Sequence, residues 1–449
     1  MALQGLPAAL NAHLAPFSRF FRSCTRDATA TFGGYLRGLF QSERANMLRM
    51  SEVNAVDHQS MQHLLTAGAV DWDGFGDPLA HEANALLGSA QSVLLIDESG
   101  FAKKGERSAG VARQWNGRLG KVDNCQVGVF AALCRGEMAS LVDARLDLPQ
   151  AWADDALRCA QAAIPEHARD YRSKTALALA MVATAQRRGL RFGYVGVDGG
   201  YGKEPAFLSG LDALGCRFVA DVHCHQSVYL QDPAPQVPAW SGRGPRPRLA
   251  QAQSTAVRVD HWVAAQPAAA WQRRCLRGGE KGPLVAEYLH TRVWVWDHSQ
   301  AQARCWQLFV RREVGATEIS HYCLSNAPEH TPWIELARVQ AQRFFIEHRF
   351  REAKSACGLA DYQVRRWDAW HHHMALVMLA TLFLAKQKIQ GRGHWPMLSF
   401  NDLVTALAHL LPRRQLTAED LADIITQRHR RREQAKECHA RRVAALDGI

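Results

Sequence analysis

Two short apolar runs that each close on an aspartate constrain the fold of this chain more than any other feature. The first spans Ser92–Asp97 and the second Arg191–Asp198, and glycine follows each within a few residues. Apolar runs of this length, bounded by turn residues, are typical of strands that are buried on both faces of a sheet. A helical pattern at Lys174–Arg188 leads into the second run. Strands and helices mixed in this way predict a layered α/β core.

The chain changes character several times along its 449 residues, which are too many for one compact core. Helical patterns mark its two ends, whereas strand-like stretches alternate between the second acidic run and residue 335. The predicted segments are a helical region 1–88 that we expect to bind DNA, a first core part 89–222, a β-rich insertion 223–335, a second core part 336–390 and a basic helical region 391–449.

The charge balance favours a polyanionic partner. Lys and Arg total 54 against 43 Asp and Glu, a formal charge of +11, and cations that neutralise phosphates release condensed counterions. The 11 cysteines include no Cys-x-x-Cys pair, so they predict reduced thiols rather than a zinc or redox site. The longest apolar run, Met374–Ala385, is too short to span a bilayer and predicts a buried helix. Since no secretory signal is visible, we expect a soluble cytoplasmic protein.

Three acids carry the chemistry that we expect. Asp97 and Asp198 close the apolar runs, and Glu347 lies on a helix predicted from Trp333 to Ser355. Two divalent ions about 4 Å apart can activate the attacking oxygen and stabilise the leaving oxygen of a phosphodiester, and hard Mg²⁺ prefers carboxylates. The strand-end position favours Asp97 over Glu98, because sheets of this class present ligands at strand ends. Each acid taken singly could equally be a turn residue or a helix cap.

The predicted helix of the third acid carries cations on the same face. At about 100° per residue, Arg343, Glu347 and Lys354 share one stripe. Cations beside a metal-binding carboxylate would suit phosphate contacts. A solvated, salt-bridged helix face has the same spacing and stays open as the alternative. Glu352 is rotated by about 140° from Glu347, so Glu347 is the preferred third acid.

Several longer motifs resemble those of one family. They are Leu94–Gly105, Val111–Gly117, Gly120–Val127, Val195–Gly202, Phe345–Lys354 and Gly358–Arg365. In these stretches the chain resembles insertion-sequence transposases of the DDE superfamily, in particular the insertion-sequence-701 group. The resemblance covers most of the chain. It implies an RNase H-like catalytic core that is interrupted by a β-rich insertion domain and flanked by helical N- and C-terminal regions.

The resemblance also implies an activity. Asp97, Asp198 and Glu347 would hold two Mg²⁺ ions, for which Mn²⁺ may substitute. The enzyme would hydrolyse a phosphodiester at each element end, and the freed 3′-hydroxyl would attack target DNA. Its partners would be double-stranded DNA and further copies of the chain, as a homodimer or higher oligomer on DNA, at the nucleoid in the bacterial cytoplasm.

A wider branch of this superfamily carries a Tyr-Arg-Glu-Lys signature around the third acid. Arg343, Glu347 and Lys354 match its last three positions, and the resemblance implies that both cations contact DNA phosphates. The Tyr position is Gln340 in this chain. This departure puts an aromatic or hydroxyl contact there in doubt, but it leaves the metal ligands untouched.

Further cations are candidates for contacts with the DNA backbone. They are Lys103, Lys104 and Arg113 beyond the first acid, and Arg243, Arg246 and Arg248 in a loop rich in Pro and Gly. An ordinary exposed loop explains each set equally well. A basic helix in the tail is a further DNA-binding candidate, with a solvated helix as the alternative.

Two groups of side chains could be interpreted as functional, but we expect both to have packing roles. Trp294, Trp296 and Trp306 lie in predicted strands and are expected in the core rather than stacked on a base. The adjacent histidines 371–373 point in different directions on a helix. They cannot all bind one ion, so a packing or capping role is predicted.

Two other functions stay open. A metal-dependent phosphohydrolase would use Asp97 as its nucleophile, but such enzymes usually carry a second Asp two residues later, where this chain has Ser99. The other alternative is a DNA-binding protein that derives from a transposase and does not cut. The intact trio of acids argues against it.

Overall fold

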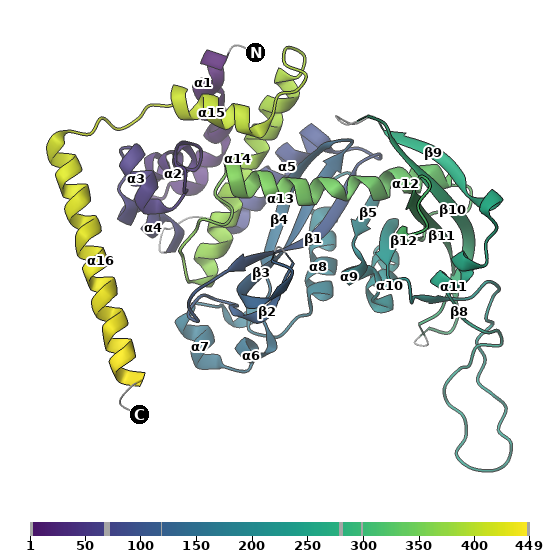
Figure 1. The fold of residues 1–449 in the computed structure, drawn as a ribbon. Coiled ribbons are helices and arrows are strands. Elements are labelled where there is room, and N and C mark those ends of the chain that lie inside the picture. Colours follow the sequence, from purple (N-terminus) through teal and green to yellow (C-terminus); the bar gives the residue numbers. More distant parts are fainter. Residues whose placement is uncertain (1–2, 67–71, 118, 278–281, 298–299, 447–449) are drawn as a thin grey trace.

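The computed structural model describes residues 3–66, 72–117, 119–277, 282–297 and 300–446. Figure 1 shows helices of the N-terminal part towards one end of the molecule, the strands β9 to β12 towards the other, and the remaining strands of the same mixed sheet between them. The fold is α/β, as predicted. Within the described ranges, no helix has both the length and the apolar composition that crossing a bilayer requires.

The N-terminal region is helical, as predicted, and packs against the long helix α14 (Trp367–Gly391). Its elements are η1 (Leu3–Gly5), α1 (Leu6–Leu14), η2 (Ala15–Phe21), α2 (Thr29–Gln41), α3 (Met47–Val53), α4 (His58–Thr66) and α5 (Trp72–Leu87). The helices α2, α4 and α5 all contact α14. Between α2 and α14, the Tyr35 hydroxyl lies 2.7 Å from His373 Nδ1 inside the core, so this region and the second core part share one apolar interior.

One large sheet forms the centre of the molecule. Its strands are β1 (Val93–Ala102), β2 (Ala112–Asn116), β3 (Lys121–Arg135), β4 (Met138–Leu146), β5 (Tyr194–Val197), β6 (Phe218–Val222), β9 (Gln272–Arg277), β10 (Leu284–Val295), β11 (Arg304–Glu313) and β12 (Ile319–Ser325). Their order is β2-β3-β1-β5-β6-β12-β11-β10-β9, with β4 paired to β3. β1, β5 and β6 run parallel, whereas β3 is antiparallel to both β1 and β4.

Strand β1 differs from the prediction, because it does not end at Asp97. It continues to Ala102 and pairs antiparallel with β3 along its whole length, which places Asp97 in mid-strand opposite Phe130. The apolar run stops at the acid, but the backbone hydrogen bonds to β3 carry the strand further. The second run behaves as predicted, since β5 ends at Val197 and Asp198 follows it.

Helices cover the sheet and carry the third acid. α8 (Lys174–Arg187) contacts β3, and α13 (Phe344–Ala356) contacts β1, β3 and β4. The single helix predicted up to Ser355 is two helices, α12 (Trp333–Gln342) and α13, which meet at Arg343. Arg343 keeps helical dihedral angles, with φ −54° and ψ −36°. The i,i+4 relation between Arg343 and Glu347 is therefore retained.

The remaining elements are short, apart from two C-terminal helices. They are α6 (Gln150–Ala153), α7 (Ala156–Gln161), η3 (Glu166–Ala168), α9 (Gly199–Gly202), α10 (Pro205–Ala213), β7 (Ser227–Val228), β8 (Val257–Arg258), α11 (Val259–Ala264), η4 (Ala268–Ala270), α15 (Phe400–Leu410) and α16 (Ala418–Leu446). Figure 1 shows α16 standing away from the rest of the molecule. An ion pair of 2.5 Å between Arg428 and Glu52 links it to α3.

The segment predicted as a β-rich insertion extends the central sheet. β12 pairs antiparallel with β6, and β11, β10 and β9 follow outward. Trp296 and Trp306 are buried, as predicted, and Trp306 packs edge-on against Phe218 with ring centroids 5.1 Å apart. Trp294 is half-buried. The Pro- and Gly-rich stretch between β7 and β8 forms a long loop that projects from this end of the molecule (Figure 1).

Candidate active site

Asp97, Asp198 and Glu347 line one cavity of about 470 Å³. Asp97 comes from β1, Asp198 follows β5, and Glu347 lies in the first turn of α13. β1 and β5 are parallel neighbours that pair Leu95 with Gly196. Asp97 and Asp198 each lie two residues beyond this pair. α13 crosses this position and adds the third carboxylate. Three distant stretches of chain thus meet at one site.

Asp198 is oriented by the backbone that follows it. Its Oδ1 accepts hydrogen bonds from the amides of Gly200 at 2.9 Å and Tyr201 at 3.2 Å, so the carboxylate caps α9. The helix-cap alternative is therefore correct for this residue, but the same carboxylate also lines the cavity. One oxygen is engaged with the backbone, and a metal ion can bind a carboxylate through the other oxygen.

Asp97 lies in an environment that opposes its negative charge. Burial raises its pKa to about 7, repulsion from Asp198 and Glu347 adds to the rise, and attraction to Arg343 offsets only part of it. A buried carboxylate among other carboxylates needs a compensating cation. The donor set consists of carboxylate oxygens, the ligands that hard divalent ions prefer. These residues therefore fit a Mg²⁺ or Mn²⁺ site.

Arg343 is held by an acid that the sequence analysis missed. Its guanidinium donates to Asp221, at the end of the parallel strand β6, and its other terminal nitrogen lies 3.7 Å from Glu347. Asp221 also accepts hydrogen bonds from His321 at 3.1 Å and from Gln340 at 3.4 Å. Arg343 is thus fixed by Asp221 and faces Glu347, and its contact with DNA phosphate stays a prediction. The only sequence signal for Asp221 was an acid inside a third apolar strand.

Gln340, at the signature's Tyr position, is buried and donates to Asp221. It therefore supports the anchor of Arg343 from inside the protein. Burial alone would raise the pKa of Asp221, but the hydrogen bond from His321 and the charge of Arg343 hold it below its usual value. Asp221 is thus an ionised partner for the arginine.

Lys354 lies on the opposite side of Glu347 along α13. Its Nζ donates to Ser99 Oγ at 2.7 Å and lies 5.4 Å from the centre of the Phe101 ring. Both Lys354 and the exposed Arg351 line the cavity. Arg351 was not predicted. These cations face a space that a substrate phosphate can reach.

The two rejected acids have other partners. Glu352 is bound by Arg349 at 2.7 Å and by His348 at 3.1 Å, away from the cavity. Glu98 lines the cavity, but it pairs with Lys174 at 2.6 Å. The preference for Glu347 over Glu352 and the preference for Asp97 over Glu98 are both consistent with these contacts.

The other predicted DNA contacts lie apart from the three acids. Lys103 and Lys104 line a separate cavity with Arg44, Arg107 and Arg365. Burial lowers the pKa of Lys103 to about 8, and its Nζ lies 3.6 Å from the centre of the Tyr362 ring. Arg113 is exposed on β2. The loop cations Arg243, Arg246 and Arg248 are exposed at the far end of the sheet. The structure brings none of these six described cations into the cavity of the acids.

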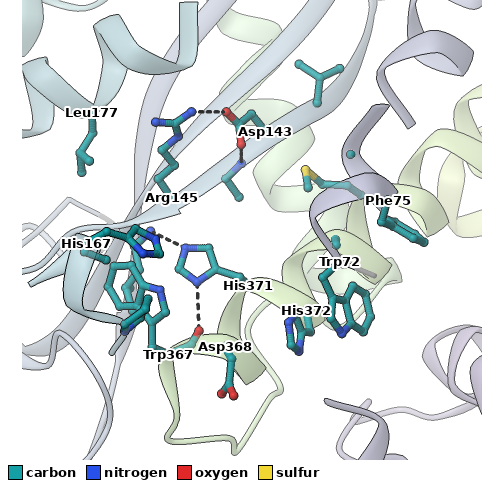
Figure 2. Close-up of a pocket in the computed structure, with 18 of the residues that line it drawn as sticks. Trp72, Phe75, Asp143, Arg145, His167, Leu177, Trp367, Asp368, His371 and His372 are labelled. Atoms are coloured by element: carbon teal, nitrogen blue, oxygen red, sulfur yellow. Dashed lines mark hydrogen bonds and ion pairs between the residues drawn. The ribbon is translucent and has the colours of Figure 1, made fainter. Parts of the chain in front are cut away.

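A third cavity, of about 720 Å³, lies between α5, β4, α8 and α14 (Figure 2). It contains two of the three adjacent histidines. His371 Nδ1 donates to the Trp367 carbonyl at 2.9 Å, its Nε2 accepts from the Leu146 amide at 3.4 Å, and His372 stacks on Trp72. Burial lowers the pKa of His371 to about 4, so this ring is neutral. The predicted packing role of the histidines is confirmed.

Comparison with known proteins identifies the class. A family model described as "DDE superfamily endonuclease" matches residues 19–283, more than half of the chain, which therefore belongs to this family. A protein from Microchaete diplosiphon, named "Probable transposase for insertion sequence element IS701", is 22% identical over 330 residues. The aligned region covers 72% of this chain and 74% of that protein. The family match includes Asp97 and Asp198 but ends before Glu347, so the place of Glu347 rests on the geometry of the cavity.

Proposed function

We propose that this chain is a DNA transposase of a bacterial insertion sequence. The observation that carries the proposal is the meeting of Asp97, Asp198 and Glu347 in one cavity, in a chain of the DDE endonuclease family. The similarity to an insertion-sequence transposase supports the same reaction. The strand order β4-β3-β1-β5-β6, with parallel β1, β5 and β6, supports an RNase H-like core.

In the proposed reaction the three acids hold two Mg²⁺ ions, which would activate the attacking oxygen and stabilise the leaving one. The protein's own part is placement and charge. β1 and β5 fix Asp97 and Asp198, while Arg343 holds Glu347 towards them. Lys354 and Arg351 supply positive charge for the substrate phosphate. After hydrolysis at the element end, the same site would place the freed 3′-hydroxyl against target DNA.

The assembly and the location follow from the proposed reaction. Both ends of an element must be processed together, so we propose a homodimer or higher oligomer on DNA. The partners are double-stranded DNA at the ends and at the target. A bacterial enzyme with this substrate would work at the nucleoid, in the cytoplasm.

A strand-cleavage assay tests the proposal. The substrate is a duplex made from the DNA that flanks the gene, incubated with the full chain and Mg²⁺. Wild type should cut at the element end, and Asp97→Ala, Asp198→Ala and Glu347→Gln should each abolish cutting while DNA binding, measured by gel shift, is largely retained. A variant that cuts at the normal rate would contradict the assignment.

The same assay separates the two rival functions. A non-cutting DNA-binding protein would shift the duplex without cutting it. A phosphohydrolase with Asp97 as nucleophile would form a covalent intermediate, which hydrolysis by activated water does not. Such a phosphohydrolase usually carries a second Asp two residues after its nucleophile. Ser99 stands at that position here, and its Oγ accepts a hydrogen bond from Lys354.

A further inference from the structure

Cys224, His225 and Asp260 form a cluster of metal-binding side chain types outside the catalytic cavity. Cys224 and His225 lie in the turn between β6 and β7, and Asp260 lies in the first turn of α11. The Asp260 amide donates to the Cys224 carbonyl oxygen at 3.1 Å, and the Val259 amide donates to the Gln226 carbonyl oxygen at 2.9 Å. These backbone hydrogen bonds hold the turn against the start of α11, so the fold itself brings the three side chains together.

The spacing of the three donor atoms fits one tetrahedral metal ion. His225 Nδ1 lies 3.5 Å from Cys224 Sγ and 3.5 Å from Asp260 Oδ2, and the ligand atoms of the trio all lie within 4.8 Å of one another. Tetrahedral bonds of about 2.3 Å to sulfur and about 2.1 Å to nitrogen or oxygen place neighbouring ligand atoms about 3.4–3.6 Å apart. Both distances from the imidazole nitrogen fall within this range.

A positively charged group already lies between two of these donors. Arg258 Nη2 donates to His225 Nδ1 and, at 2.5 Å, to Asp260 Oδ2. This nitrogen therefore lies where a metal ion bound to the same two atoms would lie. The Arg258 side chain is 40% exposed, so the guanidinium can turn into solvent when a metal ion replaces it. The trio thus forms a place that binds a cation.

The types of donor select a different metal from the one that suits the three acids. Mg²⁺ and Mn²⁺ prefer oxygen ligands, whereas thiolate and imidazole ligands suit Zn²⁺. The sequence analysis expected no zinc site, because the chain has no Cys-x-x-Cys pair. Here one ligand comes from a distant segment, and the pairing of the turn with α11 supplies the proximity that a short motif supplies elsewhere.

We propose that Cys224, His225 and Asp260 bind one Zn²⁺ ion, with water as the fourth ligand. The His225 side chain is 69% exposed, so water can reach the open position of a site with three protein ligands. The ion is separate from the metal ions of the proposed cleavage reaction and does not depend on them.

The ion would stabilise the base of the long Pro- and Gly-rich loop. β7 and β8 pair at this base through Ser227 with Arg258 and Val228 with Val257. Two ligands precede the loop and the third follows it, so the bound ion would link the chain on both sides. Removal of Zn²⁺ should therefore loosen the loop while the three acids stay in the catalytic cavity.

Cobalt substitution tests the ligand set without relying on activity. The full chain is stripped of metal with a chelator and titrated with Co²⁺ in excess Mg²⁺, which competes for the three acids. Wild type should bind one Co²⁺ with the visible absorption of a tetrahedral site and a thiolate-to-cobalt band, and Zn²⁺ should displace it. The thiolate band should disappear in Cys224→Ser. His225→Ala and Asp260→Asn should each weaken binding roughly 10- to 100-fold or more, since even the loss of an outer hydrogen-bond partner costs that much.

Matched variants locate the ion. Cys24→Ser removes another exposed thiol and should leave the thiolate band unchanged. Glu347→Gln alters the catalytic cavity and should bind Zn²⁺ like wild type. Arg258→Gln removes the competing guanidinium and should bind Zn²⁺ more tightly than wild type. Limited proteolysis reports on the loop, and Zn²⁺ should slow cleavage within residues 229–256 in wild type but not in Cys224→Ser.

The outcomes separate this inference from the proposed function. A thiolate band that persists in Cys224→Ser, or a Zn²⁺ affinity that is unchanged in both His225→Ala and Asp260→Asn, would overturn the zinc site. Loss of Zn²⁺ binding in Glu347→Gln would assign the ion to the catalytic cavity and would also overturn it. A protein that binds Zn²⁺ through the trio but never cuts DNA would retain the zinc site and contradict the proposed function.

Discussion

The buried carboxylate of Asp97 destabilises the metal-free protein, and the proposed metal site would explain why this acid is buried. The folded protein holds the pKa of this carboxyl at about 7, against an ordinary value of 3.8, chiefly through burial and then through repulsion from Asp198. Because the folded pKa is the higher one, the native state binds a proton more readily than the unfolded chain. The metal-free protein should therefore lose stability as the pH rises from about 4 to about 7.

Asp97→Asn should remove this pH-dependent loss. At pH values above the folded pKa, the metal-free variant should be more stable than wild type by up to ~4 kcal/mol, since one pKa unit corresponds to about 1.4 kcal/mol. The gap should close below the ordinary pKa, where both states are protonated. Thermal melts with and without Mg²⁺ measure this difference in stability, and Mg²⁺ should stabilise wild type only. The exposed Asp423→Asn on α16 is the control, and a variant less stable than wild type at high pH would refute the explanation.

Lys354 offers a second test at the residue scale. It lines the cavity, and its predicted role is contact with a DNA phosphate. Lys354→Ala should weaken binding of the end DNA and reduce the slope of log affinity against log salt by about one. Arg135→Ala removes an exposed cation at the turn between β3 and β4 and should leave the slope unchanged. An unchanged slope for Lys354→Ala would assign the lysine to contacts within the protein, such as that with Ser99.

The residues beyond the acids show where sequence reasoning stops. Asp97, Asp198 and Glu347 could be selected because the motifs around them resemble those of a known family, whereas local spacing alone left a turn, cap or salt-bridge role open for each acid. Asp221 and the inward role of Gln340 could not, because they depend on β6 meeting α12 and α13 in space.

At the scale of elements, α9 shows why a glycine is needed at position 202. A Cβ at Gly202 would lie 1.9 Å from the Asp221 carbonyl oxygen, a backbone atom that cannot move without shifting β6. Gly202→Ala should cost about 1–3 kcal/mol of stability, as overpacking usually does. It should also slow cleavage, because α9 and β6 hold Asp198 and Asp221.

Denaturant unfolding and the cleavage assay check this expectation. Gly105→Ala is the matched control, because nothing lies within 4 Å of the added Cβ. The control should unfold and cut like wild type. A Gly202→Ala protein that is as stable and as active as the control would show that the β6 backbone can shift to make room for the added Cβ. The close contact between Gly202 and Asp221 would then not position the acids.

Element boundaries were predicted less well than element types. Burial and alternation located the strands, but hydrogen bonding to β3 extends β1 five residues past Asp97. The helix with the third acid was found from its spacing, whereas its division at Arg343 was not. Arg343 retains helical angles, so no local sequence signal marks this division.

At the scale of the whole molecule, the insertion is part of the central sheet. Its strand-rich character could be predicted from alternation, but the pairing of β12 with β6 joins segments about a hundred residues apart. Local patterns contain no information on such pairing. The division into five domains stays a prediction. The family assignment is confirmed, since the model of the DDE endonuclease family matches residues 19–283.

Anomalous X-ray scattering from crystals of the full chain soaked in Mn²⁺ tests the site most directly. Two peaks about 4 Å apart are expected, within bonding distance of carboxylate oxygens from Asp97, Asp198 and Glu347. The same peaks should be absent or reduced in crystals of Glu347→Gln. A cavity without manganese at saturating concentration, or manganese bound only by other residues, would contradict the two-metal site and the reaction built on it.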